Sequence, residues 1–194
     1  GRLGECKHLI GELCKEDTLI DEICVNDVGM LDYVSSNFGQ KIFLGRLFMK
    51  EQRDPRNPKL RYQQHAAGCL DAMIKQLLLQ YKITGVEFDK IYNSMEIPSE
   101  LSTYILGVHA PYAYITTGRM CMYAGMHKQG AMQFETDGGC QLECRQKRTC
   151  FSSQNGFFMK IGRTVYYPSV PCDYKFSGCI REIYWPCEAD GKGR

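Results

Sequence analysis

The chain has 194 residues, 44% of them hydrophobic and 24% charged, with a formal net charge of +2. These values are typical of a soluble globular domain, and the charge alone does not indicate nucleic acid or membrane as a partner. There is no apolar run of about 18 residues and no signal-peptide pattern, so we expect neither membrane span nor export. The 11 cysteines then fit a reducing cytoplasm, where clustered thiols indicate metal binding before disulfides.

The N-terminal part predicts an α/β fold. Residues 2–16 have the spacing of an amphipathic helix, whose apolar stripe, including Cys6 and Cys14, is expected to face the core. Short buried strands follow at 23–25 and 41–45, with a helical pattern between them. This strand–helix–strand order favours parallel pairing, and functional groups in such sheets gather at the C-terminal ends of the strands.

Polar residues stand at such strand ends in this chain. Arg46 directly follows the second strand and is either a substrate-binding residue or a surface charge. The strongest helical pattern covers 63–81, and two more strands are predicted at 86–89 and 104–108. Asp89 ends the first of these, which makes it a candidate carboxylate of the site.

Three cysteines make the most distinctive local pattern. Arg119 and Cys121 directly follow a predicted strand over 112–117, and Cys140 and Cys144 follow after a loop. Cysteines four residues apart lie on one face of a helix. Thiolates bind zinc and iron–sulfur clusters, both of which need about four ligands, so three here leave one to be found elsewhere. The alternative is that these thiols are buried and inert.

The pattern changes after the last of these cysteines. Residues 157–167 predict a β-hairpin around Gly162 and Arg163. We therefore divide the chain into a barrel-like domain over 1–145, which the resemblance described next implies, and a cysteine-rich C-terminal extension over 146–194.

Four segments together resemble a known family. They read ICVNDVGML, KIFLGRLFMKEQRDPR, VEFDKIY and YAYITTGRMC, the last followed by a C-x18-C-x3-C pattern. In order and spacing they are similar to the collagenase-like peptidase family U-thirty-two, over about residues 20–145. The last segment with its trailing cysteines is the most specific part of the resemblance.

The resemblance implies a TIM-like (β/α) barrel and, in many members, a [4Fe–4S] cluster. Several members look like oxygen-independent hydroxylation factors for RNA bases or the ubiquinone ring, and others carry an older description as proteases. Cys121, Cys140 and Cys144 match cluster-ligand positions. One branch takes a further ligand at the position of Cys179, but it also has a cysteine where this chain has Tyr114.

The length sets a further expectation. A complete barrel takes about 250 residues, whereas this chain opens on a helix. We therefore predict a partial or incomplete barrel, and we hypothesise a partner subunit that completes it, because open strand edges are a liability.

Three functions remain open at this point. The first is an iron–sulfur protein in which Arg46, Asp89 and Arg119 bind a small molecule or RNA base for oxygen-independent hydroxylation or a related redox modification. The second is a peptidase or hydrolase, as the name of the family implies. His109 and His127 flank Cys121 in sequence, but no H-E-x-x-H motif is present. The third is a non-catalytic subunit of a larger complex, stapled by zinc or a cluster.

Overall fold

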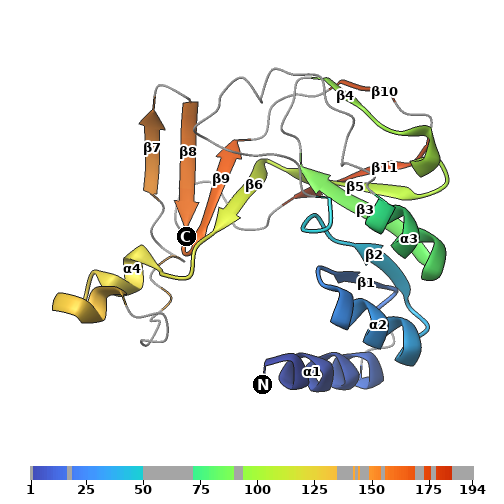
Figure 1. Ribbon diagram of the computed structural model, residues 1–194, viewed down its shortest axis with the longest axis horizontal. Helices are drawn as coiled ribbons and strands as arrows, with labels where there is room; N and C mark the ends of the chain where they lie inside the picture. Colours follow the sequence, from blue (N-terminus) through green and yellow to red (C-terminus); the bar gives the residue numbers. More distant parts are fainter. Residues whose placement is uncertain are drawn as a thin grey trace.

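The computed structural model describes residues 2–16, 19–49, 72–89, 94–134, 142, 144, 149–153, 156–168, 173–175 and 178–184. These residues form a mixed α/β fold with one parallel and one antiparallel sheet, which confirms the predicted α/β class (Figure 1). One hydrophobic core joins the two sheets, since it contains Val86 of the first and Tyr167 of the second.

The parallel sheet has five strands in the order β1-β2-β3-β5-β11. They are β1 (Glu22–Val25), β2 (Lys41–Leu44), β3 (Ile83–Asp89), β5 (Ile105–Ala110) and β11 (Ile180–Tyr184). The first four follow chain order and match the predicted strands, although β3 begins earlier than expected. The last strand returns from the C-terminal segment and pairs with β5 in parallel.

One face of this sheet is packed against two helices, α2 (Val28–Asn37) and α3 (Ala72–Gln80). The Asp27 side chain caps α2 by accepting a hydrogen bond from the Met30 backbone N–H at 2.8 Å, which fixes the turn out of β1. Leu31 and Ile74 are fully buried between these helices and the sheet. Residues 63–71 of the predicted long helix lie outside the described residues.

The N-terminal helix α1 (Arg2–Glu16) has the predicted bounds, but its expected burial is wrong. Cys6 is exposed and Cys14 is half-buried, and Leu13 is 46% exposed. The physical reason is position: α1 packs beside α2 at the edge of the molecule and only Ile10 touches the core (Figure 1). An apolar stripe shows which face of a helix can be buried, and the neighbouring elements decide whether it is.

The antiparallel sheet has the strand order β6-β9-β8-β7. Its strands are β6 (Tyr112–Thr117), β7 (Thr149–Ser153), β8 (Gly156–Ile161) and β9 (Thr164–Pro168). Strands β8 and β9 form the predicted hairpin around Gly162 and Arg163. Strand β6 follows β5 after a cis Ala110–Pro111 bond, so the chain passes directly from the parallel sheet into the antiparallel one.

The remaining elements are short. They are β4 (Ser94–Glu96), β10 (Asp173–Lys175), α4 (Met122–Gly125), and the 3-10 helices η2 (Ser99–Leu101) and η3 (Gly130–Phe134). The described strands do not close into a barrel, because β1 and β11 end the parallel sheet without pairing to each other. In the part of the chain that the structure describes, every helix is too short or too polar to cross a membrane.

Candidate functional site

Cys121 and Cys144 lie at the same end of the antiparallel sheet, around the turn that joins β8 to β9. Gly118, which precedes Cys121, donates its backbone N–H to the Arg163 carbonyl of this turn at 2.9 Å. A Cβ placed on Gly162 of the turn would lie 3.4 Å from Sγ of Cys144. Two predicted metal ligands from distant parts of the sequence therefore flank one turn.

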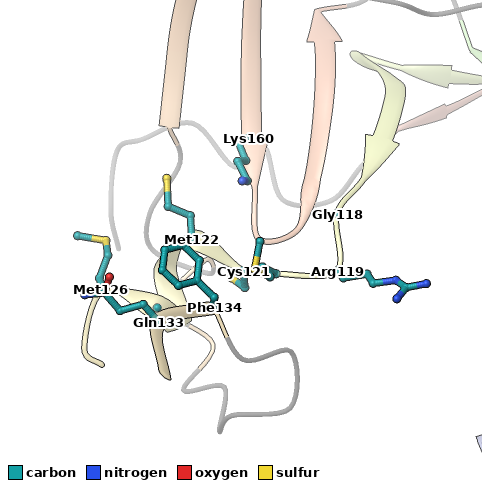
Figure 2. Close-up of a pocket in the computed structure, with 10 residues that line it drawn as sticks. Gly118, Arg119, Cys121, Met122, Met126, Gln133, Phe134 and Lys160 are labelled. Carbon is teal, nitrogen blue, oxygen red and sulfur yellow. The ribbon is translucent and has the colours of Figure 1, made fainter. Parts of the chain in front are cut away.

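A cavity of about 520 Å³ opens beside Cys121 (Figure 2). Its walls come from the segment that follows β6, from α4 and η3, and from β8. Most of the lining is apolar, and the cations that line it are Arg119 and Lys160. Figure 2 shows the guanidinium of Arg119 at the rim, extending away from the methionine and phenylalanine side chains. The predicted substrate residue Arg119 thus lies next to a predicted metal ligand.

The other two predicted metal ligands are not part of this arrangement. Cys179 precedes β11, and its carbonyl accepts the backbone N–H of Leu106 at the start of β5, whereas Cys121 follows β6 beyond the far end of β5. Cys140 lies outside the described residues. Within the described ranges no three His, Cys, Asp or Glu side chains converge as a metal-binding group. The four-cysteine ligand set stays a prediction, and the structure does not bring Cys179 to Cys121.

Arg46 and Asp89, the other predicted substrate residues, pair with each other. Arg46 Nη1 lies 3.0 Å from Asp89 Oδ1, and the Asp89 side chain is completely buried. The guanidinium also lies over the rings of Tyr114 and Tyr166, at 5.7 and 6.0 Å from their centroids. This pair connects the end of the parallel sheet to the antiparallel sheet, so both residues have a structural role. Their role in substrate binding stays a prediction.

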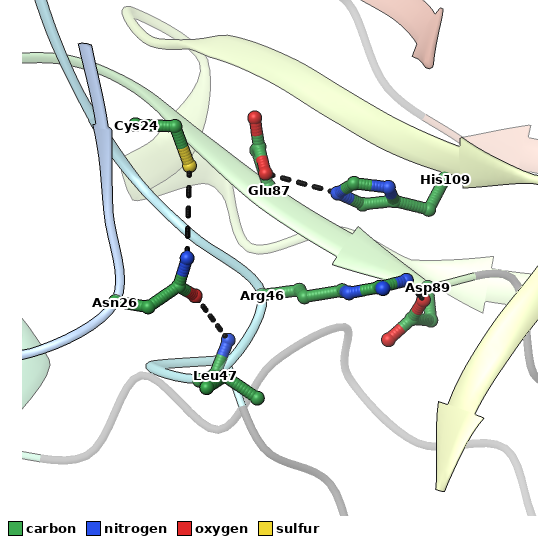
Figure 3. Close-up of polar contacts among 7 residues, drawn as sticks. All are labelled: Cys24, Asn26, Arg46, Leu47, Glu87, Asp89 and His109. Carbon is green, nitrogen blue, oxygen red and sulfur yellow. Dashed lines mark hydrogen bonds and ion pairs between the residues drawn. The ribbon is translucent and has the colours of Figure 1, made fainter. Parts of the chain in front are cut away.

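A second polar cluster, drawn in Figure 3, has its side chains on the parallel sheet. Their neighbours in sequence, Val86, Phe88 and Val108, belong to the core with α2 and α3, so the cluster lies on the opposite face. Oε2 of Glu87 on β3 lies 2.9 Å from Nε2 of His109 on β5, and the thiol of Cys24 on β1 lies close enough to this carboxylate to interact with its charge. Glu87 and His109 are only 8% and 9% exposed. The Asn26 side chain extends the cluster, since it donates to Cys24 and accepts the Leu47 backbone N–H.

This cluster sets the protonation of two of its members. Loss of hydration, followed by the neighbouring Glu87 carboxylate, raises the pKa of the Cys24 thiol far above its ordinary value. Burial alone would also raise the pKa of Glu87. Hydrogen bonds from His109 and Cys24 outweigh burial, and with the positive charge of Arg181 they lower the pKa of Glu87. The cluster therefore holds a carboxylate and a protonated thiol.

The cluster of Cys24, Glu87 and His109 was not predicted from the sequence. A signal was available in β3, because Glu87 and Asp89 are two residues apart and therefore point to one face of the sheet. The pairing of the strands was needed to bring them together, since Glu87 and His109 belong to different strands of the chain. Lys160 was also missed, because its hairpin carries no signal for the pocket it borders.

Comparison with models of protein families, with curated proteins and with solved structures gives no match for this chain. The resemblance to the U-thirty-two family therefore rests on the four sequence segments alone.

Proposed function

We propose that this chain is an iron–sulfur protein similar to members of the U-thirty-two family. It would take part in oxygen-independent hydroxylation, or a related redox modification, of a small molecule or an RNA base. The observation that carries the proposal is that Cys121 and Cys144 flank one turn beside a cavity bordered by Arg119. When bound there, a [4Fe–4S] cluster would supply one-electron chemistry next to that cavity.

The described residues fit such a cluster in part. Cys121 and Cys144 would supply two thiolates from one place, and Cys140 would be the third, four residues before Cys144 in the sequence. A fourth ligand near the β8–β9 turn is still required, and Cys179 does not lie there. The free state of every described cysteine supports a reducing compartment, so we also propose that the protein works in the cytoplasm.

We further propose that the parallel sheet belongs to a partial or incomplete (β/α) barrel-like domain. Its support is the order β1-β2-β3-β5, in which neighbours in the sheet are also successive along the chain, with α2 and α3 on one face. Both edges of this sheet end without a further described strand. A partner subunit that pairs with an open edge would complete the barrel.

Metal analysis of protein purified without oxygen tests the cluster. We expect about four irons and four sulfides per chain, with broad visible absorption. Cys121→Ser, Cys140→Ser and Cys144→Ser should each lose the absorption and most of the iron. Cys6→Ser is the matched control, because Cys6 is an exposed thiol on α1 and its loss should leave the iron content unchanged.

Two other results would overturn the proposal. One zinc and no iron per chain would favour the non-catalytic subunit stapled by metal. Protein without metal under these conditions, and after reconstitution with iron and sulfide, would mean that the cysteines at the turn do not bind a cluster.

The peptidase alternative has no support from the geometry that we see. A cysteine peptidase needs a thiol within reach of a histidine base. In the described part of the chain, His109 is hydrogen-bonded to Glu87 at 2.9 Å. Burial and the neighbouring Glu87 carboxylate raise the pKa of Cys24, which makes this thiol a poor nucleophile.

A further inference from the structure

We propose that the cavity beside Cys121 binds a small aromatic molecule that carries a carboxylate or phosphate group. The proposal names the ligand class for the site of the proposed function, and the ligand would be a substrate only if that function is correct. The binding itself needs only the protein side chains. It can therefore be tested separately from the cluster.

The apolar wall of the cavity is suited to a flat ring. Met122, Met126 and Phe134 line it, and they are 41%, 63% and 66% exposed. Large apolar side chains that form a contiguous exposed patch often mark a binding site, whereas single exposed apolar residues do not. Methionine side chains adapt to the shape of a ligand, and their sulfur atoms make favourable contacts with aromatic rings.

The charge of the cavity calls for an anion. Lys160 borders it from β8 and Arg119 stands at its rim, and the described residues that line it include no Asp or Glu. Among the residues that the structure describes, neither cation makes a side-chain ion pair or hydrogen bond. A ligand anion placed against Lys160 would therefore meet a positive charge that no described side chain pairs.

Hydrogen bonds tie the two sides of the cavity together. The Tyr123 hydroxyl of α4 lies 2.6 Å from the Thr149 hydroxyl of β7, and it donates to the Lys160 carbonyl of β8 at 3.3 Å. On the other side, the Gln133 side chain of η3 donates to the Lys128 carbonyl at 2.9 Å. A cavity that is fixed before binding costs less to fill.

The size of the cavity selects a small ligand. About 520 Å³ lies within the range of pockets for small molecules. The described walls supply one apolar surface and the ammonium group of Lys160, with Arg119 at the rim, which corresponds to a single ring system with an anionic substituent. An RNA strand would need a longer basic surface, and we treat its binding as an outcome that the test can reveal.

The test compares three probes on metal-free protein and on protein reconstituted with iron and sulfide. The probes are 2-naphthoate, 2-naphthyl phosphate and the neutral 2-naphthamide, and binding is followed by titration calorimetry. We expect one or both anions to bind about tenfold more tightly than the amide, because only they can pair with Lys160. The two anions distinguish a carboxylate ligand from a phosphate ligand.

Two variants locate the binding. Lys160→Met should weaken anion binding about tenfold and leave the amide unchanged, whereas Arg119→Gln at the rim should weaken it only about twofold. Lys82→Met is the matched control, since Lys82 is an exposed lysine in the turn before β3, and it should change nothing.

Equal binding of amide and anions, or anion binding that Lys160→Met leaves unchanged, would overturn the proposal. A second contrary result would be a single-stranded RNA that binds the protein without displacing naphthoate, together with naphthoate that binds no better than the amide. Anion binding in a protein that never holds iron would leave the pocket established and remove the proposed function. A protein that binds iron but shows no preference for the anions would support the proposed function and contradict the proposed ligand of the pocket.

Discussion

The thiol of Cys24 and the carboxylate of Glu87 show how one neighbour decides the chemistry of a side chain. Cys24 is exposed as a residue on the edge strand β1, and Figure 3 shows its sulfur in contact with the Asn26 side chain. Loss of hydration and then the negative charge raise its pKa. A thiol that keeps its proton is a weak metal ligand and a weak nucleophile, so Cys24 contributes packing and a hydrogen bond instead.

Alkylation rates test this view of Cys24. In metal-free protein at pH 8, iodoacetamide should modify Cys24 at least about tenfold more slowly than the exposed Cys6, because only the thiolate reacts. The rate at Cys24 should still rise as the pH passes 9. In Glu87→Gln the raising effect of the carboxylate is gone, so Cys24 should react faster. Mass spectrometry of the labelled peptides gives both rates, and equal rates for the two cysteines would contradict the raised pKa.

At the scale of elements, the turn between β8 and β9 places the cysteines of the candidate site. Gly162 has a positive φ of 57°, which lets the hairpin turn tightly. The backbone of this turn is hydrogen-bonded to Gly118 of the segment leading to Cys121, and Gly162 faces Cys144. The hairpin therefore determines where both thiols lie, although neither belongs to it.

Substitution of Gly162 tests the role of this turn. Gly162→Ala should lower the free energy of unfolding by about 1–2 kcal/mol, because an L side chain at this positive φ is strained. The new methyl group would touch Cys144 without a clash, at 3.4 Å from its sulfur. Gly118→Ala is the control, since its Cβ would meet its neighbours at 3.7 and 3.8 Å and its φ is not positive. Urea unfolding measures both, and a neutral Gly162→Ala would show that the turn adapts.

At the scale of the whole molecule, strands from the C-terminal segment pair with strands from the middle of the chain. Strand β11 pairs with β5, and β9 pairs with β6. Arg181 on β11 also makes a 2.7 Å ion pair with Glu22 on β1, and its guanidinium lies over the Phe43 ring at 4.2 Å. The proposed boundary between 1–145 and 146–194 stays a prediction, and these pairings link the two parts closely.

A chain that ends at residue 145 would test this linkage. Without β9 and β11, strand β6 would lose its described partner and β5 would keep only β3, so both would expose unpaired backbone groups. We expect this shortened chain to unfold without a cooperative transition, while the full chain unfolds in one step. Circular dichroism during urea titration makes the comparison. A cooperative transition of the shortened chain would establish 1–145 as a domain that folds by itself.

The sequence by itself determined the local elements of this protein. The strand–helix–strand rhythm, the strand break at Pro111 and the hairpin at Gly162 and Arg163 are encoded by neighbouring residues, through side-chain periodicity and turn chemistry. The same patterns predicted the α/β class. They also identified Cys121 and Arg119 as residues to examine, and the structure places both beside one cavity.

Only the tertiary structure decided which elements meet. Periodicity tells which face of an element can be buried, but strand pairing and packing depend on residues far apart in the chain. For this reason the sequence could not show that α1 stays at the edge, that β11 joins β5, or that Arg46 is paired with Asp89. The contact of Glu87 with Cys24 and His109 arises in the same way, because each of the three side chains comes from a different strand of the parallel sheet.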